Sequence, residues 1–62
     1  MSIRVTGDRI PHIFKYMEYD ALSEGQHNLV IKYEEFYLKN KYLTTNQMEV
    51  LEDIFKQAAE NI

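Results

Sequence analysis

Residues 43–58 read LTTNQMEVLEDIFKQA and carry the clearest structural signal in the chain. The Thr44 hydroxyl can accept a hydrogen bond from the backbone N–H of Gln47 while the Gln47 side chain reaches back, which is the capping-box pattern of a helix start. Leu43, one residue earlier, can pack on the next turn as a hydrophobic staple. Apolar residues then recur at helical spacing, at Met48, Leu51, Ile54, Phe55 and Ala58. The sequence therefore predicts a helix over about 45–60 with one buried face.

The other side of this helix is expected to be charged and solvated. Glu52 and Lys56 stand four residues apart, the spacing at which a carboxylate and an ammonium group attract each other on a helix surface. The charged residues on this side are Glu49, Glu52, Asp53, Lys56 and Glu60.

A second helix is predicted over about 27–41, and it is apolar on two sides. At about 100° per residue, one side carries Leu29, Tyr33, Phe36 and Tyr37. Ile31 and Leu38 fall nearly opposite, with Tyr42 beside them. A helix that is apolar on two sides has to be covered twice, either by the two other helices or by a partner.

The first helix is predicted over about 8–24, after an arm formed by residues 1–7. Asp8 suits the N-cap, and Pro11 falls in the first turn, where its missing N–H would be unsatisfied anyway. Gly25 is placed to end the helix in a left-handed conformation. The apolar stripe of this helix consists of Ile10, Ile13, Phe14, Met17 and Ala21.

These elements predict an all-α fold, a compact three-helix unit with a short N-terminal arm, in one small helical domain over residues 1–62. A chain of 62 residues buries only about 60% of the surface that its unfolded form exposes. It has no cysteine, so disulfides cannot contribute to its stability. Helix packing, or association with another chain, must supply the stability.

The chain shows no arrangement typical of an enzyme or of a metal site. Asp8 with His12, and Glu24 with His27, each offer two ligands, whereas a metal site needs three or four that converge. Glu34 and Glu35 are adjacent, so their side chains diverge by about 100° on a helix and cannot act on one substrate. We therefore expect no catalytic residues, no bound metal and no cofactor.

The overall charge favours a protein partner over nucleic acid. Seven Lys and Arg against ten Asp and Glu give a net charge of −3, which repels a phosphate backbone. The chain has no apolar run long enough to span a membrane, and its start lacks the apolar core of a signal peptide. We expect a cytoplasmic protein without a membrane association.

Four runs of the sequence together form a recognisable pattern. The pattern is an amphipathic helix, a turn, Leu-Thr/Ser-x-x-Gln as the cap and Leu-x-x-Ile on the next helix. The runs are HNLV at 27–30, YEEF at 33–36, LTTNQ at 43–47 and LEDI at 51–54. This pattern, over about half of the chain, resembles a helix-turn-helix segment of small tailed-phage proteins. It is similar to the helix-loop-helix module associated with the T4-type recombination helicase UvsW, which implies an accessory role beside a DNA-processing enzyme. Acidic residues at 49, 52 and 53 argue against direct DNA contact.

Together these observations predict a non-enzymatic, small phage-type protein that binds a protein partner as an adaptor or inhibitor. Tyrosine is enriched in protein interfaces, and the apolar side of the second helix is the preferred surface for binding or self-association. The expected interaction residues are Ile31, Leu38, Tyr42, Tyr16, Tyr19, Glu34 and Glu35.

Two other functional classes stay open. A nucleic-acid accessory module would bind single strands through Lys32, Lys39 and Lys41 beside tyrosine rings. A structural dimerisation unit would form a homodimer through Ile31 and Leu38. In that case Leu38→Asp should yield a monomer or an unfolded chain.

Overall fold

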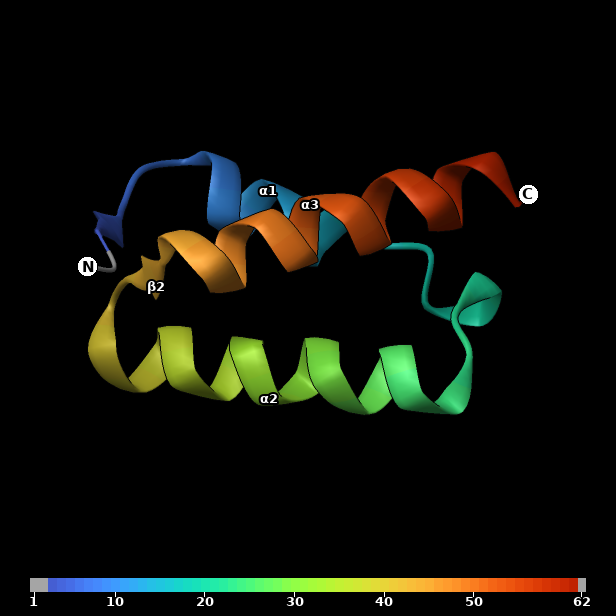
Figure 1. Ribbon diagram of the computed structural model, residues 1–62, viewed down its shortest axis with the longest axis horizontal. Helices are drawn as coiled ribbons and strands as arrows, with labels where there is room; N and C mark the ends of the chain where they lie inside the picture. Colours follow the sequence, from blue (N-terminus) through green and yellow to red (C-terminus); the bar gives the residue numbers. More distant parts are fainter. Residues whose placement is uncertain (1–2, 62) are drawn as a thin grey trace.

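The computed structural model describes residues 3–61 and shows the predicted all-α three-helix unit with an N-terminal arm (Figure 1). In chain order its elements are β1 (Arg4–Val5), α1 (Arg9–Tyr16), the 3-10 helix η1 (Tyr19–Ala21), α2 (Glu24–Asn40), β2 (Leu43–Thr44) and α3 (Thr45–Glu60). The two strands form one antiparallel pair, in which Arg4 lies opposite Thr44 and Val5 opposite Leu43. The described elements are thus helical except for this short ladder.

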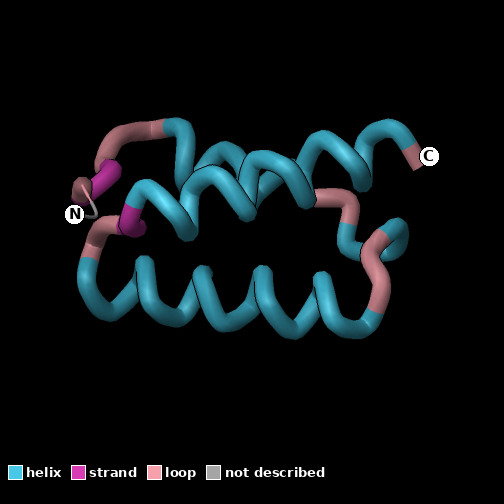
Figure 2. The backbone as a smooth tube through the Cα atoms, viewed as in Figure 1, coloured by secondary structure: helices cyan, strands magenta, loops and turns pink. Residues whose placement is uncertain are grey.

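The helices form two layers in a body of 32 × 21 × 17 Å. Figure 2 shows α2 along one side and α1 with α3 on the other, with α2 and α3 running in opposite directions. The N-terminal arm lies beside the connection from α2 to α3, and the C-terminal end of α3 lies at the far end. Of the described helices, none is long and apolar enough to cross a membrane.

The start of α3 confirms the predicted cap. The backbone N–H of Gln47 donates to the Thr44 hydroxyl at 3.2 Å, and the Thr44 N–H donates to Gln47 Oε1 at 2.9 Å. The arm is tied to the same place, because the backbone N–H of Thr45 donates to the Ile3 carbonyl at 2.9 Å. A two-residue strand that would not form alone is therefore held by the start of a helix.

The prediction of one continuous helix over 8–24 is wrong. The α-helix stops at Tyr16, and the buried Met17 takes an extended conformation with ψ 131°. The following 3-10 turn brings half-buried side chains back onto the core at Tyr19, Ala21 and Leu22. Asp8 stands at the N-cap position, but its side chain makes no capping hydrogen bond.

The reason for this break is a second capping box at Ser23. Its hydroxyl accepts from the Gln26 N–H at 3.2 Å, and its N–H donates to Gln26 Oε1 at 3.1 Å, so α2 begins at Glu24 rather than at 27. Because Ser23 has the extended backbone of an N-cap, with ψ 165°, a helix that begins at Arg9 cannot run through to residue 24. The prediction that Gly25 ends the first helix is wrong, because Gly25 lies in the first turn of α2.

The core is a single cluster at the junction of the three helices. Only one side of α2 packs on it, through the buried Val30 and the half-buried Leu29, Tyr33, Phe36 and Tyr37. The second helix is therefore not sandwiched between the others. The buried side chains are Ile10, Ile13, Phe14, Met17, Val30, Leu43, Leu51, Ile54 and Ala58.

Candidate functional site

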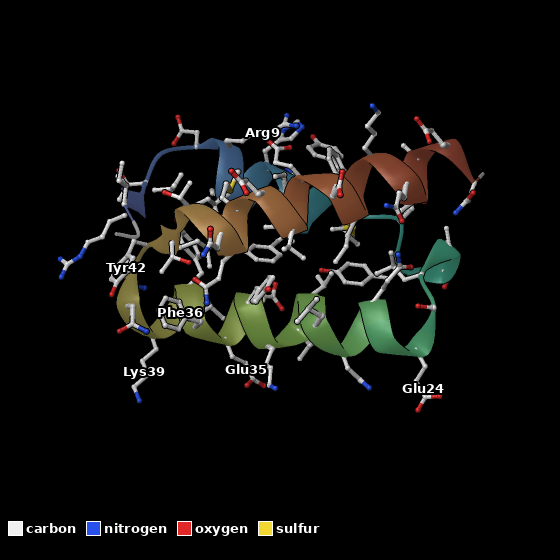
Figure 3. All side chains as sticks on the ribbon, viewed as in Figure 1. Arg9, Glu24, Glu35, Phe36, Lys39 and Tyr42 are labelled. Atoms are coloured by element: carbon white, nitrogen blue, oxygen red, sulfur yellow. The ribbon has the colours of Figure 1, made fainter. Side chains whose placement is uncertain are left out.

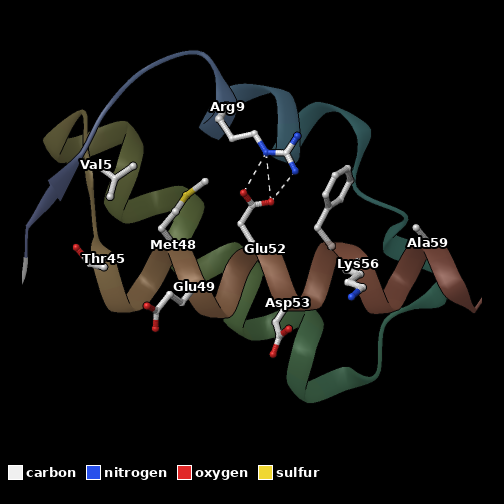
Figure 4. A pocket seen from close by; sticks show the side chains of 10 residues that line it. Val5, Arg9, Thr45, Met48, Glu49, Glu52, Asp53, Lys56 and Ala59 are labelled. Carbon is white, nitrogen blue, oxygen red and sulfur yellow. Dashed lines mark hydrogen bonds and ion pairs between the residues drawn. The ribbon is translucent and has the colours of Figure 1, made fainter.

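A groove of about 840 Å³ lies between α3 and the segment formed by the arm and α1 (Figure 4). Most of its lining comes from α3, and Val5 and Arg9 contribute from the other side. The lining residues are Val5, Arg9, Thr45, Met48, Glu49, Glu52, Asp53, Phe55, Lys56 and Ala59.

The α3 side of this groove follows a regular spacing. The steps between positions 45, 48, 52, 55 and 59 alternate between three and four residues. This is the spacing of a seam that faces a neighbouring helix. Met48 and Phe55 are half-buried on it, next to the fully buried stripe that faces the core. The first and last of these positions are 14 residues apart, which is about 21 Å at about 1.5 Å per residue. The groove is thus as long as about four helical turns.

A polar bridge crosses the middle of the groove. Arg9 donates to the Glu52 carboxylate through Nη2 at 2.6 Å and through Nε at 3.1 and 3.2 Å. These hydrogen bonds raise the pKa of Arg9 above its ordinary value. The guanidinium also lies 5.5 Å from the centre of the Phe55 ring. Glu52 is therefore paired across the groove with Arg9, and not with Lys56 along the helix as the spacing predicted.

The outer rim of the groove is acidic. Glu49 and Asp53 are exposed, stand one turn apart on α3, and point away from α1 in Figure 4. Neither carboxylate makes a side-chain hydrogen bond or an ion pair within residues 3–61. Two like charges at this spacing destabilise a helix slightly. The rim thus presents two negative charges that the fold itself leaves uncompensated.

The apolar residues predicted on the second side of α2 are exposed, and the hollow beside Leu38 is smaller than the groove. Leu38 is 60% exposed and Ile31 is 37% exposed, and both lie outside the core cluster. Leu38 and the half-buried Glu34 help to line a hollow of about 270 Å³, whose other lining residues are Pro11, Phe14, Lys15 and Tyr37. Glu35 projects from α2 away from the rest of the molecule, as do Glu24 and Lys39 (Figure 3).

The three tyrosines predicted for the interaction surface lie in three separate places. Tyr42 is half-buried with its ring 5.5 Å from that of Phe36, and the Arg4 guanidinium lies 4.8 Å from it. Tyr19 donates its hydroxyl to the Phe14 carbonyl at 3.3 Å, and burial raises its pKa above the ordinary value, with a further contribution from the charge of Glu34. Tyr16 is 54% exposed on α1. The structure therefore does not gather them into one surface with Ile31 and Leu38.

The residues considered for nucleic-acid binding are also separated. Lys32 and Lys39 lie on the exposed side of α2, whereas Tyr33 and Tyr37 pack against the core on the other side of the helix. Lys41, the C-cap of α2, has a left-handed backbone with φ 66°. No described lysine of this set has a tyrosine ring stacked beside it in position to hold a base.

The two histidines are placed apart, among aromatic rings. His12 lies 4.8 Å from Tyr16 and 6.3 Å from Phe55 between ring centres, and His27 lies 5.7 Å from Tyr19. Within residues 3–61 there is no group of three or more His, Asp or Glu that could hold a metal ion.

The groove was missed at the sequence level because its side of α3 was interpreted as a solvated charged face. The spacing of Met48, Phe55 and Ala59 was the available signal, since these residues form a second apolar stripe beside the core stripe. Arg9 carried no signal, because its partner is 43 residues away.

No protein-family model, curated protein or solved structure was found to match this chain.

Proposed function

We propose that this protein is a non-enzymatic binding module that takes up a segment of a partner protein in the groove between α1 and α3. The observation that carries the proposal is the groove itself, a hollow of about 840 Å³ with half-buried Met48 and Phe55 in its floor. Apolar grooves between helices commonly receive an amphipathic segment of another protein.

The energetics of the floor support this role. Met48 and Phe55 keep part of their apolar surface in water, and covering that surface would stabilise a complex by about 25 cal/mol per Å² of apolar area. Aromatic side chains and methionine are also enriched at protein interfaces. The groove is therefore a better candidate than the face of α2, where Leu38 helps to line a hollow about one third as large and Ile31 lines neither hollow.

The partner class follows from the sequence resemblance. A module similar to the one associated with a phage recombination helicase would act as an adaptor or inhibitor of DNA-processing proteins. Such proteins are the first partners that we would test.

Affinity capture with three forms of the chain tests the proposal. Ala59→Arg places a long charged side chain in one end of the groove and leaves the core untouched, because Ala59 is exposed. Leu38→Glu changes the face of α2 and serves as the matched control. Circular dichroism should first show that both variants remain helical.

We expect proteins that are captured by the parent and by Leu38→Glu to be lost with Ala59→Arg. The opposite pattern would transfer the binding site to α2. Capture that neither substitution changes would contradict binding through the groove.

A further inference from the structure

We infer that the occupant of the groove is an amphipathic helix that carries Lys or Arg along one flank, with apolar side chains seven residues apart and a polar side chain between them. This inference rests on the proposed function and specifies the chemistry of the partner.

The shape of the groove indicates a helix. Its floor follows the three-and-four spacing of a seam along α3, which is the pattern that interlocks with another helix lying nearly parallel to it. An occupant of about four turns would cover it from Val5 to Ala59. Its apolar side chains would pack on Met48 and Phe55, which are seven residues apart and therefore two turns apart on the same side of α3.

The charges of the groove indicate a basic flank. Three carboxylates and two cations line it, and the Arg9 charge is already paired with Glu52. This pairing leaves one cation, Lys56, against the two carboxylates of Glu49 and Asp53, which have no ion-pair partner among residues 3–61. A Lys or Arg flank on the occupant would complement this rim, whereas an acidic helix or a phosphate backbone would be repelled.

The Arg9–Glu52 bridge sets the register of the occupant. Glu52 stands between Met48 and Phe55 in the sequence of α3, and Figure 4 shows the bridge beside Met48. A polar residue within an otherwise apolar seam fixes how two helices align, because an apolar side chain placed opposite would desolvate the charges without satisfying them. The occupant must therefore present a polar side chain at this point.

Three synthetic helical peptides of 18 residues test the inference. The first has leucine at two positions seven residues apart, glutamine between them and lysine along one flank. The second has glutamate in place of each lysine. The third has the composition of the first in an order that destroys the apolar stripe. Binding is measured by isothermal titration calorimetry, and the site is mapped by backbone amide chemical shifts.

Two matched double variants of the protein separate the rim from the overall charge. Glu49→Lys with Asp53→Lys reverses the rim, and Glu18→Lys with Glu35→Lys makes the same change of charge at exposed positions outside the groove. We expect the lysine peptide to shift the amides of Met48 and Phe55. We expect the rim variant to weaken its binding about tenfold at low salt, and the control variant to change it less than about threefold.

Each other outcome contradicts the inference in a distinguishable way. If the glutamate peptide binds in the groove as tightly as the lysine peptide, the basic flank is wrong while the groove remains a binding site. If the scrambled peptide binds equally well, charge alone drives binding and a docked helix is excluded. If none of the peptides shifts the groove while Ala59→Arg still abolishes capture, the groove binds something other than a basic helix, and the proposed function survives the failure.

Discussion

The connection between α2 and α3 is held by the rest of the fold at several points, whereas the connection between α1 and α2 is held at few. In the first, Leu43 is fully buried and pairs with Val5, and Thr45 binds the arm through its backbone and its hydroxyl. In the second, Leu22 is only half-buried, and the Ser23 cap is exposed. The same capping box therefore begins a helix in two different settings.

This difference shows what a local signal contributes when the surrounding structure differs. Each box provides acceptors for the N–H groups of the N-cap residue and of the residue three positions later. At Thr44 these hydrogen bonds are partly shielded from water. A hydrogen bond that water can replace adds less to stability than one that water cannot reach. Substitutions in matched pairs at the two connections can break or sharpen this comparison.

The largest effect is expected from removing the buried leucine. Leu43→Ala should lower the free energy of unfolding by about 2–5 kcal/mol, because it deletes a fully buried side chain and leaves a cavity. Leu22→Ala should cost about 1 kcal/mol, because the half-buried side chain loses less transfer free energy. Urea unfolding followed by circular dichroism measures both, and equal costs would contradict the comparison.

A smaller effect is expected from the two caps. Thr44→Ala should cost about 1–2 kcal/mol and Ser23→Ala about 0.5–1 kcal/mol, since capping residues span this range and the Thr44 bonds are the less exposed. Thermal melts of the two variants provide the measurement. A larger loss at Ser23 would mean that solvent shielding does not control the strength of these caps.

The two connections also differ in how well the sequence predicts the helix ends beside them. The start of α3 was predicted to the residue, because Thr44 and Gln47 carry a signal that depends only on positions three apart. The end of α1 was not, because Ile10, Ile13, Phe14, Met17 and Ala21 continue the helical spacing beyond the point where the helix stops. Ser23 and Gln26 have the same spacing as the box at 44–47 and were the available signal.

The candidate site was predictable only in part. The exposure of Ile31 and Leu38 follows from the two-sided pattern of α2, which the sequence displays. The groove depends on the approach of α1 to α3 and on the pairing of Arg9 with Glu52, two residues that are far apart in the sequence. The apolar spacing of Met48, Phe55 and Ala59 was visible in the sequence, but the element that approaches it and the Arg9–Glu52 pairing leave no periodic signal.

Two glycines extend the comparison with effects of opposite sign. Gly7, in the arm that pairs with the α2–α3 connection, has φ 114°, so Gly7→Ala should lower stability by about 1 kcal/mol. Gly25 lies in the first turn of α2 with open space around it, so Gly25→Ala should raise stability by about 0.5–1 kcal/mol. Urea unfolding of both variants checks the signs, and a loss at Gly25 would contradict the prediction.

The smallest effect is expected at alkaline pH, from Tyr19 in the α1–α2 connection. Burial raises the pKa of this tyrosine in the folded protein, so the unfolded chain loses the phenol proton first, at an ordinary value of about 10. Its contribution to stability is therefore complete below that pH and is lost as the pH rises through the folded pKa. Urea unfolding of the parent and of Tyr19→Phe between pH 8 and pH 11, with the pH values chosen to span about 10, should show a steeper alkaline loss of stability in the parent.

The Tyr19→Phe variant also lacks the hydroxyl that donates to the Phe14 carbonyl, so its stability should start lower and converge toward that of the parent as the pH rises. Parallel curves would mean that Tyr19 ionises equally easily in both states, and that the α1–α2 connection is too open to hold the phenol in its neutral form.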